Sequence, residues 1–370
     1  MIPQTSHNQQ RYPLVLALDT SCDDTSAAVM QGNRVLSNVI ASQTDLHRPY
    51  GGVFPTVAKQ AHKENIEPTV SLALKRAGVS SADLDCVAVT QGPGLAPALE
   101  VGLNFAKNLA NTLQKPLVAV NHIEGHALSP WAVPKTHAPS RPNEIAFPIL
   151  SLVISGGHSQ FILLKNIGEY EILGTTIDDA AGEALDKIGR MLNLGYPAGP
   201  VIEQLAKQGN SHAYTFPLPM TTVKNYNLSF SGLKTYARNL LEEIEEKGGL
   251  NKTQICDFTA SAQRSIFRHI IYKLNKLLDD YEVNEIWLGG GVAANVELRK
   301  MIRTLLKKRS RNAGEKTKKP LPLRIPYTKK LCADNAAMIG LVAGYKFQNS
   351  EVLVQPEKLD RRPRWKIGEQ

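Results

Sequence analysis

A strand–turn–strand pattern stands near the start of each half of the chain. In the first half, Leu14–Met30 (LVLALDTSCDDTSAAVM) combines two apolar runs with an acidic turn between them. In the second half, the apolar run Phe147–Ile154 leads into the turn SGGHS and then into the run QFILLKN. The elements recur, although the residues themselves do not. The pattern predicts a duplicated α/β fold, with two mixed-sheet lobes and a ligand in the cleft between them.

The segments behind each hairpin favour the same architecture. Apolar spacing predicts helices and strands in alternation, namely helices over 58–77 and 98–113 and strands over Cys86–Thr90, Pro116–Val120 and Glu285–Leu288. We expect an N-terminal lobe over residues 12–140, a C-terminal lobe over 145–347 with a helical insertion at about 176–260, and a basic tail over 348–370.

Composition excludes several classes of protein. The 370 residues are 42% hydrophobic and 21% charged, which is typical of a globular chain and not of a disordered one. No apolar run approaches the ~20 residues of a membrane helix, and the first residues lack a signal-peptide pattern, so we expect a cytoplasmic protein with no membrane contact. The four cysteines are widely spaced, which argues against a disulfide framework and a cysteine-built zinc site.

The formal charge of +9 is unevenly distributed. Segment 307–324 (KKRSRNAGEKTKKPLPLR) holds eight basic residues and one acid, and a second basic run, KLDRRPRWK, lies close to the C-terminus. These runs can be a solvated loop and a frayed tail. They can equally be a surface for a polyanion such as RNA, where lysine and arginine neutralise the phosphates and so release their counterions into solution. Composition alone does not choose between these interpretations.

Two glycine-rich turns each follow an apolar strand, SGGH at 155–158 and GGG at 289–291. Glycine allows backbone N–H groups to approach an anion closely, and a helix after the second turn would add the positive end of its dipole. We interpret the two turns as occupying matching positions in the two halves, which favours a phosphate site. Glycine also simply makes turns, and neither segment matches a P-loop or a G-x-G-x-x-G motif.

The segment NHIEGH (121–126) follows a predicted strand, with Asn121 placed to cap a helix. On that helix His122 and His126 lie about 40° apart, as two metal ligands should, whereas Glu124 lies about 180° from their midpoint. In the H-E-x-x-H motif of zinc proteases the glutamate directly follows the first histidine and works beside the metal. Glu124 is therefore predicted not to be such a base. Two unrelated surface histidines are the alternative.

A metal site needs a third ligand, and Asp334 in LCADNAAMIG is the candidate. It stands at the start of a predicted helix, where its alternative role is an N-cap. Two histidines and one aspartate leave metal positions open for a substrate and suit iron or zinc. The acidic hairpin DTSCDD adds Asp19, Asp23 and Asp24 at one bend. These acids can position a metal, a water molecule or an amine, or only stabilise an Asx-type turn.

Taken together, these segments resemble one family, the tRNA threonylcarbamoyladenosine synthase TsaD family, formerly described as O-sialoglycoprotein endopeptidases. The resemblance covers roughly Leu14 to Tyr345. It is carried in order by DTSCDDTS, YGGVFPTVAKQAH, TQGPGLAPALEVG, NHIEGH, VISGGHSQ, TIDDAAGEALDKIGRMLNLGYPAGP, NLSFSGLKT, GGGVAANVELR and CADNAAMIG.

The resemblance implies an α/β fold of two ribonuclease-H-like lobes, of the actin and sugar-kinase-like (ASKHA) kind, around a nucleotide cleft. It implies transfer of threonylcarbamoyl from threonylcarbamoyl-AMP to the N6 amine of the adenosine adjacent to the anticodon in tRNAs that read ANN codons. It also implies one divalent metal ion per chain, Fe²⁺ rather than Zn²⁺. The partners it implies are tRNA, a TsaB-like non-catalytic paralogue and a TsaE-like ATPase.

The resemblance also assigns roles to residues. The metal ligands of the family match His122, His126 and Asp334. The positions that match its adenylate site are Val153, Ile154, Ser155, Gly156, Gly157, Asp186, Gly199, Glu203 and Asn295. Asp23 matches an acid of the family's hairpin, and we take it as the candidate that orients or deprotonates the attacking amine.

Three other functions remain open from the residues alone. A metalloprotease would need a base beside the metal, which Glu124 does not supply. An ATP-dependent small-molecule kinase of the same superfamily would have no use for the histidine pair with Asp334. A non-catalytic RNA-binding or scaffold protein would use the basic segments and would need no adenylate pocket.

Overall fold

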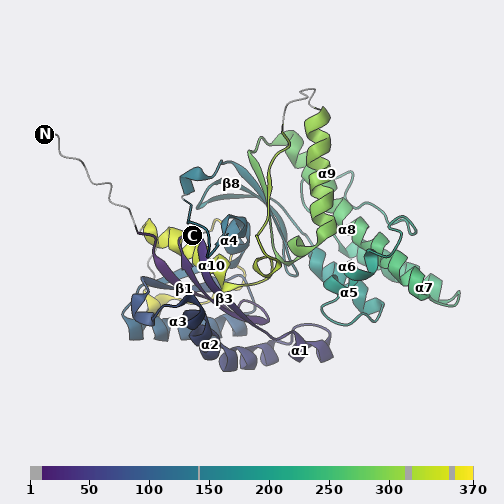
Figure 1. Ribbon diagram of the computed structural model, residues 1–370. Helices are drawn as coiled ribbons and strands as arrows, with labels where there is room; N and C mark the ends of the chain where they lie inside the picture. Colours follow the sequence, from purple (N-terminus) through teal and green to yellow (C-terminus); the bar gives the residue numbers. More distant parts are fainter. Residues whose placement is uncertain (1–10, 141, 313–318, 350–354, 370) are drawn as a thin grey trace.

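The computed structural model describes residues 11–140, 142–312, 319–349 and 355–369, which form two β-sheets with helices around them (Figure 1). The first sheet has the order β5-β4-β1-β2-β3-β6 and consists of β1 (Leu14–Asp19), β2 (Asp24–Gln31), β3 (Arg34–Ser42), β4 (Cys86–Gly92), β5 (Leu117–Asn121) and β6 (Val133–Pro134). The second has the order β11-β10-β7-β8-β9 and consists of β7 (Ile149–Ile154), β8 (Ser159–Asn166), β9 (Glu169–Thr175), β10 (Glu285–Gly289) and β11 (Leu323–Arg324).

The two sheets share one topology. In the first, β1, β2 and β3 pair antiparallel, and β4 and then β5 extend the sheet in parallel from β1. In the second, β7, β8 and β9 pair antiparallel, and β10 and then β11 extend it in parallel from β7. The predicted duplicated, ribonuclease-H-like α/β architecture is therefore confirmed, with β1 equivalent to β7 and β4 equivalent to β10.

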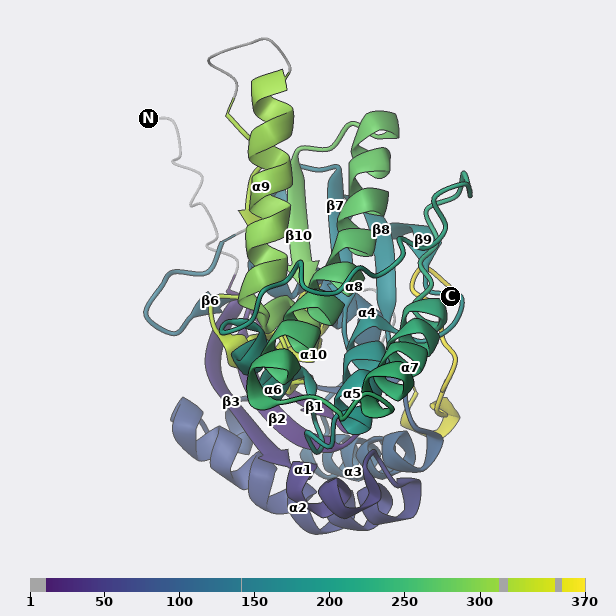
Figure 2. The same cartoon turned by 90° about the vertical axis from the view of Figure 1, so that its right-hand side faces the viewer.

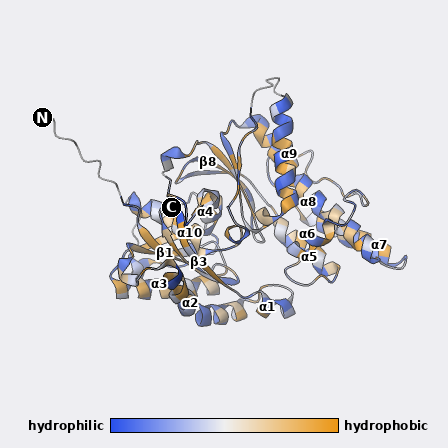
Figure 3. Cartoon of the chain, viewed as in Figure 1, coloured by the Kyte–Doolittle hydropathy of each residue, from blue (hydrophilic) through white to orange (hydrophobic). Residues whose placement is uncertain are grey.

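Helices cover the two sheets unequally. The first sheet is covered by α2 (Pro55–Ala77) and α3 (Ala96–Leu113), and the short α1 (Thr44–His47) precedes them. The second lobe adds a helical layer made of α5 (Ala181–Met191), α6 (Gly199–Ala206), α7 (Ser231–Glu245), α8 (Lys252–Asp280) and α9 (Val296–Asn312). Figure 2 looks onto this layer, in front of β7, β8 and β10. Hydrophobic residues concentrate on the strands, whereas much of α9 is hydrophilic (Figure 3).

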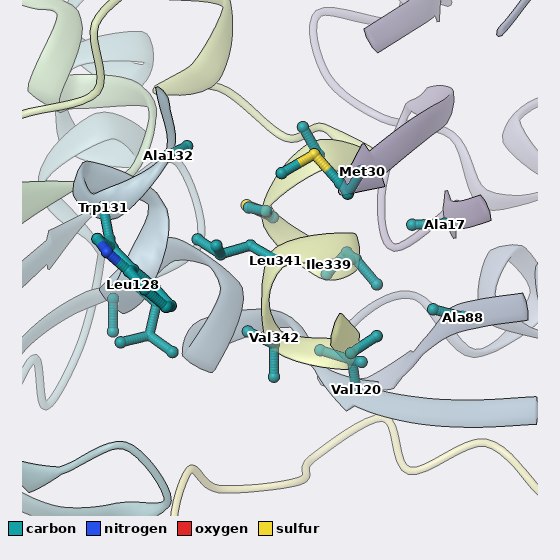
Figure 4. Close-up of a cluster of buried hydrophobic side chains, with 14 of the residues drawn as sticks. Ala17, Met30, Ala88, Val120, Leu128, Trp131, Ala132, Ile339, Leu341 and Val342 are labelled. Carbon is teal, nitrogen blue, oxygen red and sulfur yellow. The ribbon is translucent and has the colours of Figure 1, made fainter. Parts of the chain in front are cut away.

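Two helices are exchanged between the lobes. The helix α4 (His122–Leu128) follows the last long strand of the first sheet but packs against β7 and β10 of the second. The helix α10 (Ala336–Gln348) follows the second sheet but packs against β1 and β2 of the first. In Figure 4, Ile339 and Val342 of α10 lie in the buried cluster that also holds Val120. The two helices therefore meet in the core between the sheets.

The glycine of NHIEGH allows this meeting. A Cβ atom on Gly125 would lie 3.0 Å from Met338 Cγ and 3.2 Å from Ile339 Cδ1 of α10. These separations are shorter than ordinary van der Waals contact, so an added Cβ atom would require Met338 or Ile339 to shift by a few tenths of an ångström. Gly125 therefore lets α4 and α10 pack closely where they cross.

The C-terminal segment is not a frayed tail where the structure describes it. Leu359 and Ile367 are buried against the core, and the backbone N–H of Arg362 donates to the carbonyl of Gln91 at 2.8 Å. That interpretation is therefore wrong for residues 355–369. Residues 313–318 of the basic segment and residues 350–354 of the tail lie outside the described part of the chain.

Candidate metal and ligand cleft

A cleft opens between the two sheets, at the ends of β1 and β7. Its volume is about 780 Å³. The turns after β1, β4, β7 and β10 line it together with the starts of α5, α6 and the segment before α10. Among the predicted site residues, those that line it are Asp23, His122, Ser155, Gly156, Gly157, Asp186, Gly199, Glu203, Asn295 and Asp334.

His122, His126 and Asp334 come together at the floor of this cleft. The Nε2 atoms of His122 and His126 lie 3.5 and 3.0 Å from one oxygen of Asp334, and one ligand atom from each of the three residues lies within 4.8 Å of the others. His126 is fully buried beneath His122, and their rings meet edge to face at 4.6 Å. Two imidazoles and a carboxylate that converge in this way can hold one metal ion.

The electrostatics of the three residues fit such an ion. Burial acts to raise the pKa of Asp334, but the two histidines beside it outweigh burial and hold that pKa well below its usual range. Burial acts to lower the pKa of His122, but Asp334 and Asp19 raise it to about 10. The Nδ1 atoms of His122 and His126 are buried and have no hydrogen-bond partner in the described chain. In the absence of an ion Asp334 and Asp19 therefore favour a proton on His122, and a bound cation would displace that proton, because histidine ligates a metal as the neutral imidazole.

The local sequence explains how α4 presents the histidines. The side chain of Asn121 caps the helix by accepting from the backbone N–H groups of Ile123 and Glu124 at 2.8 and 3.3 Å. The predicted N-cap is confirmed. Glu124 turns away from the histidines, as the helix geometry predicts, but it is buried rather than on the surface. Its carboxylate accepts from the Tyr170 hydroxyl at 2.9 Å and pairs with the Lys346 ammonium at 2.7 Å.

Asp334 does not cap the helix that follows it. Asn335 is the N-cap of α10, and its Oδ1 accepts from the N–H of Met338 at 3.3 Å. Asp334 therefore has no part in starting the helix, and its carboxylate faces the two histidines. The alternative role considered for this residue is thereby removed.

The two glycine turns do not occupy matching positions in the two lobes. Both belong to the second sheet, where β7 and β10 pair in parallel and bring Val153 opposite Gly289. The equivalent of SGGH in the first lobe is the turn after β1, which carries Ser21, Cys22 and Asp23. The prediction of matching positions is therefore wrong, because the equivalence of two turns follows from strand order and not from glycine content.

The glycines of SGGH face open space. A Cβ atom on Gly156 or Gly157 would meet no protein atom within 4 Å, and neither residue has a positive φ that would require glycine. Packing therefore does not explain them. The room they leave belongs to the cleft, where a ligand could approach the backbone closely.

Three polar residues of the cleft wall, Asp186, Glu203 and Asn295, also stabilise the helices around the cleft by accepting hydrogen bonds from backbone N–H groups. One oxygen of Asp186 accepts from the N–H groups of Ala198 and Gly199 at 2.8 and 3.1 Å, at the start of α6. An oxygen of Glu203 accepts from the N–H of Val296 at 2.9 Å, at the start of α9.

Asn295 likewise both lines the cleft and stabilises the start of a helix. Its Oδ1 accepts from Glu297 and Leu298 at the start of α9, and its Nδ2 donates to Gln263 of α8 at 2.7 Å. Val153 and Ile154 differ from the rest of the predicted set, because their side chains are buried in the two cores and do not line the cleft.

The acidic hairpin places Asp23 and Asp24 on the opposite wall. Burial first, and then the charge of Asp334, raises the pKa of Asp23 above its ordinary value. Burial raises the pKa of Asp24 to about 7. Carboxylates of this kind accept a proton more readily than exposed ones near neutral pH.

Two contacts near the metal group were not predicted from the sequence, although Asp19 was one of the three acids considered for positioning a metal. Asp19 is fully buried, and its Oδ2 lies 3.6 Å from His122 Nδ1, where a carboxylate can orient a ligand histidine. His158 lines the cleft with its ring 6.5 Å from that of His122, and burial lowers its pKa to about 4, so it is neutral near pH 7. Both belong to motifs that the sequence makes conspicuous, DTSCDD and SGGH, but neither spacing indicated the contact.

The fold and the cleft place the chain in the actin-like and sugar-kinase-like class of two-lobed α/β proteins. Among solved structures, HypF from T. kodakarensis superposes with a TM-score of 0.58 at 14% identity, over 93% of this chain and 48% of HypF, a likeness of fold alone. The family model described as tRNA N6-adenosine threonylcarbamoyltransferase (TsaD) matches residues 34–341.

Curated relatives of that name agree. The relative from Clostridioides difficile (strain 630) is 44% identical over 339 residues, which cover 91% of this chain and 94% of the relative. The relative from Symbiobacterium thermophilum is 45% identical over 334 residues, which cover 90% and 91%. The chain belongs to the family of tRNA N6-adenosine threonylcarbamoyltransferases. No helix in the described part of the chain is both long and apolar enough to cross a lipid bilayer.

Proposed function

We propose that this chain transfers the threonylcarbamoyl group from threonylcarbamoyl-AMP to the N6 amine of the adenosine adjacent to the anticodon in tRNAs that read ANN codons. The amine nitrogen forms a bond to the carbamoyl carbon, the bond from that carbon to the phosphate oxygen breaks, AMP leaves, and the amine loses a proton. Membership of the transferase family supports this reaction. The observation that carries it is the meeting of the His₂Asp group with the open SGGH turn in one cleft.

The two sides of the cleft suit the two ends of this substrate. The N–H groups around Gly156 and Gly157 would hold the phosphate, and Asp186, Gly199, Glu203 and Asn295 would enclose the rest of the adenylate. Val153 and Ile154 would contribute through the backbone alone, since their side chains are buried.

His122, His126 and Asp334 would hold the metal ion, which when bound supplies an electrophile that polarises the carbamoyl group. Their neighbours keep them in place, with Asp19 beside His122 and Asn121 fixing the start of α4. The mixed nitrogen and oxygen donor set suits Fe²⁺ and Zn²⁺, and we propose one Fe²⁺ per chain.

Asp23 is the proposed residue that orients the N6 amine and takes up its proton. It lines the same cleft as His122 and has a raised pKa. An exocyclic amine is a poor nucleophile, so that positioning should account for much of the rate. Glu124 is not available for this task, because both of its oxygens are engaged by Tyr170 and Lys346.

The remaining expectations are proposals that rest on the family. We propose that tRNA is the acceptor, that a TsaB-like paralogue and a TsaE-like ATPase assist, and that the chain acts in the cytoplasm. The lobe boundaries at residues 12–140 and 145–347 are kept as predictions, with the insertion at about 176–260 and the tail from 348.

The test is a transfer assay on the full chain with threonylcarbamoyl-AMP and unmodified tRNA, with and without the partner proteins, accompanied by metal analysis. The wild type should form threonylcarbamoyladenosine and contain close to one metal ion. His126→Ala should lose the metal and at least about a hundredfold of the activity.

Glu124→Gln is the matched control on the same helix. It should keep the metal while losing stability, because Lys346 is left without its buried partner. If His126→Ala retained full metal and activity, the assigned site would be wrong. Peptidase activity in place of transfer would overturn the proposed reaction itself.

A further inference from the structure

A second pocket lies on the helical layer of the C-terminal lobe, apart from the cleft. Its volume is about 270 Å³, and it shares no lining residue with the cleft. It lies between α8 and the segment that precedes α7 in the chain, and its lining residues are Ser211, His212, Tyr214, Thr215, Phe216, Ser261, Arg264, Ser265 and Arg268. Nothing in the proposed transfer reaction uses it.

The pocket holds two arginines without counter-ions. Arg264 and Arg268 stand one turn apart on α8, so their side chains leave the helix about 40° apart. Both are half-buried, and neither makes a hydrogen bond or an ion pair in the described part of the chain. Arg309 is different, since its guanidinium bonds to Asp279 at 2.7 Å. Two unpaired guanidinium groups on one wall favour an anionic ligand.

A buried hydroxyl faces the same space. Ser265 is 4% exposed and lines the pocket, and its Oγ has no hydrogen-bond partner in the described chain. The neighbouring hydroxyl of Ser261 is already engaged, since it accepts from the N–H of Tyr214 and donates to the carbonyl of Asn210. The buried Ser265 hydroxyl, beside the unpaired guanidinium groups of Arg264 and Arg268, can donate a hydrogen bond to an acceptor on a ligand.

No carboxylate among the lining residues competes for the arginines. Asp257 lies one turn before Ser261 on α8, but it is not part of the lining, and its Oδ1 accepts from the backbone N–H of Asn210 at 2.6 Å. The pocket is therefore positively charged, and aromatic side chains are also among its lining residues. The ring of Phe216 packs at 5.8 Å against that of Phe258.

The pocket and the cleft lie on opposite faces of α8. At about 100° per residue, Ser261, Arg264, Ser265 and Arg268 fall within an arc of roughly 100°, and Gln263 points the other way. Gln263 bonds to Asn295 in the wall of the cleft. The pocket rim carries the exposed residues His212 and Thr215, so an extended ligand can reach it from solvent.

We propose that this pocket binds a phosphate group, with Arg264 and Arg268 as a double fork and Ser265 as a third donor. The phosphate is a backbone phosphodiester of the tRNA, away from the adenosine that reacts in the cleft. A polyanion such as tRNA suits a chain of net charge +9. The phosphodiester backbone of one tRNA molecule is long enough to reach both the cleft and the pocket on the opposite face of α8. The choice of tRNA rests on the proposed function. The preference for a phosphate rests on the pocket alone.

The test compares Arg264→Gln/Arg268→Gln with Lys75→Gln/Arg76→Gln, a control that removes the same charge from exposed positions on α2. The binding of unmodified tRNA to the full chain is measured over a range of salt concentrations. The pocket variant should weaken binding about tenfold or more and reduce the slope of log K against log salt by about 1. The α2 control should change affinity by less than about threefold.

A second measurement identifies the source of the phosphate. Inorganic phosphate, compared with chloride at equal ionic strength, should raise the melting temperature of the wild type but not of the pocket variant. Ser265→Ala should halve this effect or more, with an unchanged melting temperature in chloride. Unaltered tRNA binding with a lost phosphate effect would overturn the assignment to tRNA and leave a small phosphate ligand. If neither measurement separated the pocket variant from the control, the site itself would be refuted.

Transfer by the wild type, measured in parallel, separates this inference from the proposed function. If the wild type modifies tRNA while the pocket variant binds tRNA as the control does, only the pocket assignment fails. If the wild type binds tRNA through the pocket and modifies none, the proposed transfer fails and the pocket stands.

Discussion

The two lobes share one topology but carry opposite chemistry at the same position. After β1 the first lobe places Ser21, Cys22 and Asp23, whereas after the equivalent β7 the second lobe places Ser155, Gly156 and Gly157. Acidic side chains repel a phosphate, and bare glycine N–H groups attract one. Two turns at equivalent positions therefore line one cleft, and their residues suit the first to an amine or a metal and the second to an anion.

The largest expected effect concerns the acidic turn. Asp23→Asn should lower kcat for transfer by about 10²- to 10⁴-fold, because the amide keeps the shape of the carboxylate but cannot accept the proton. The effect should fall on kcat and not on the KM for threonylcarbamoyl-AMP. Asp24→Asn, on the next residue, should cost less than about tenfold. Full activity of Asp23→Asn at saturating tRNA would remove this residue from the chemistry.

A buried histidine in the second lobe should make the fold sensitive to acid. His269 of α8 is buried, its Nε2 accepts from the N–H of Ser229, and burial lowers its pKa from 6.5 to about 4. Between these values the unfolded chain binds a proton that the folded chain does not bind. Stability should therefore fall by up to roughly 3 kcal/mol as the pH drops from about 6.5 to about 4.

Urea unfolding at several pH values measures this loss. His269→Gln should flatten the pH dependence by a similar amount, whereas His137→Gln, which changes an exposed imidazole, should leave it unaltered. An equal slope in wild type and His269→Gln would show that other groups dominate the acid sensitivity.

A single added methyl group at Gly125 should weaken the packing of α4 against α10. Gly125→Ala should destabilise the fold by about 1–3 kcal/mol and weaken metal binding, because the new Cβ meets Met338 at 3.0 Å. Gly232→Ala is the control, since Gly232 lies in α7, where an added Cβ would meet no atom within 4 Å and alanine favours the helix. Thermal melting and metal titration of both variants measure the difference. Unchanged stability of Gly125→Ala would mean that the crossing adjusts freely.

The smallest expected effect concerns the glycine turn. Gly157→Ala should raise the KM for threonylcarbamoyl-AMP by about tenfold and change the melting temperature little, because the methyl group enters the cleft and touches no protein atom. Comparing the KM and kcat of Gly157→Ala with those of Asp23→Asn tests whether the two turns serve different parts of the substrate. If both variants affected kcat alone, the two turns would not serve separate parts of the substrate.

Local patterns were enough to predict the elements and the class of fold. The apolar runs predicted β1, β4, β5, β7 and β10, and the helical spacing predicted α2 and α3 to within a few residues. Local geometry also predicted that Asn121 caps α4 and that Glu124 turns away from the histidines. These features depend on residues at most a few positions apart, so they can be predicted from a single sequence.

Contacts between residues far apart in the chain could not be predicted from local patterns. The equivalence of the glycine turns was misassigned because strand order inside a sheet is set by pairing between distant segments. The contacts of Asp19 and His158 with His122 were not predicted, since they join the end of β1 and the turn after β7 to a helix that follows β5, and only the pairing of distant strands brings these segments together.

Local patterns were sufficient to predict the two halves and the pair of histidines on one helix face, and the ordered motifs were sufficient to predict the family. The surroundings of the histidines depend instead on tertiary packing. The exchange of α4 and α10 brings Asp334 to His126 and Lys346 to Glu124 across more than two hundred residues of chain. Helix periodicity fixes where a side chain points, but only the packing of the two sheets decides what it meets, because burial and charge pairing depend on elements far away in the chain.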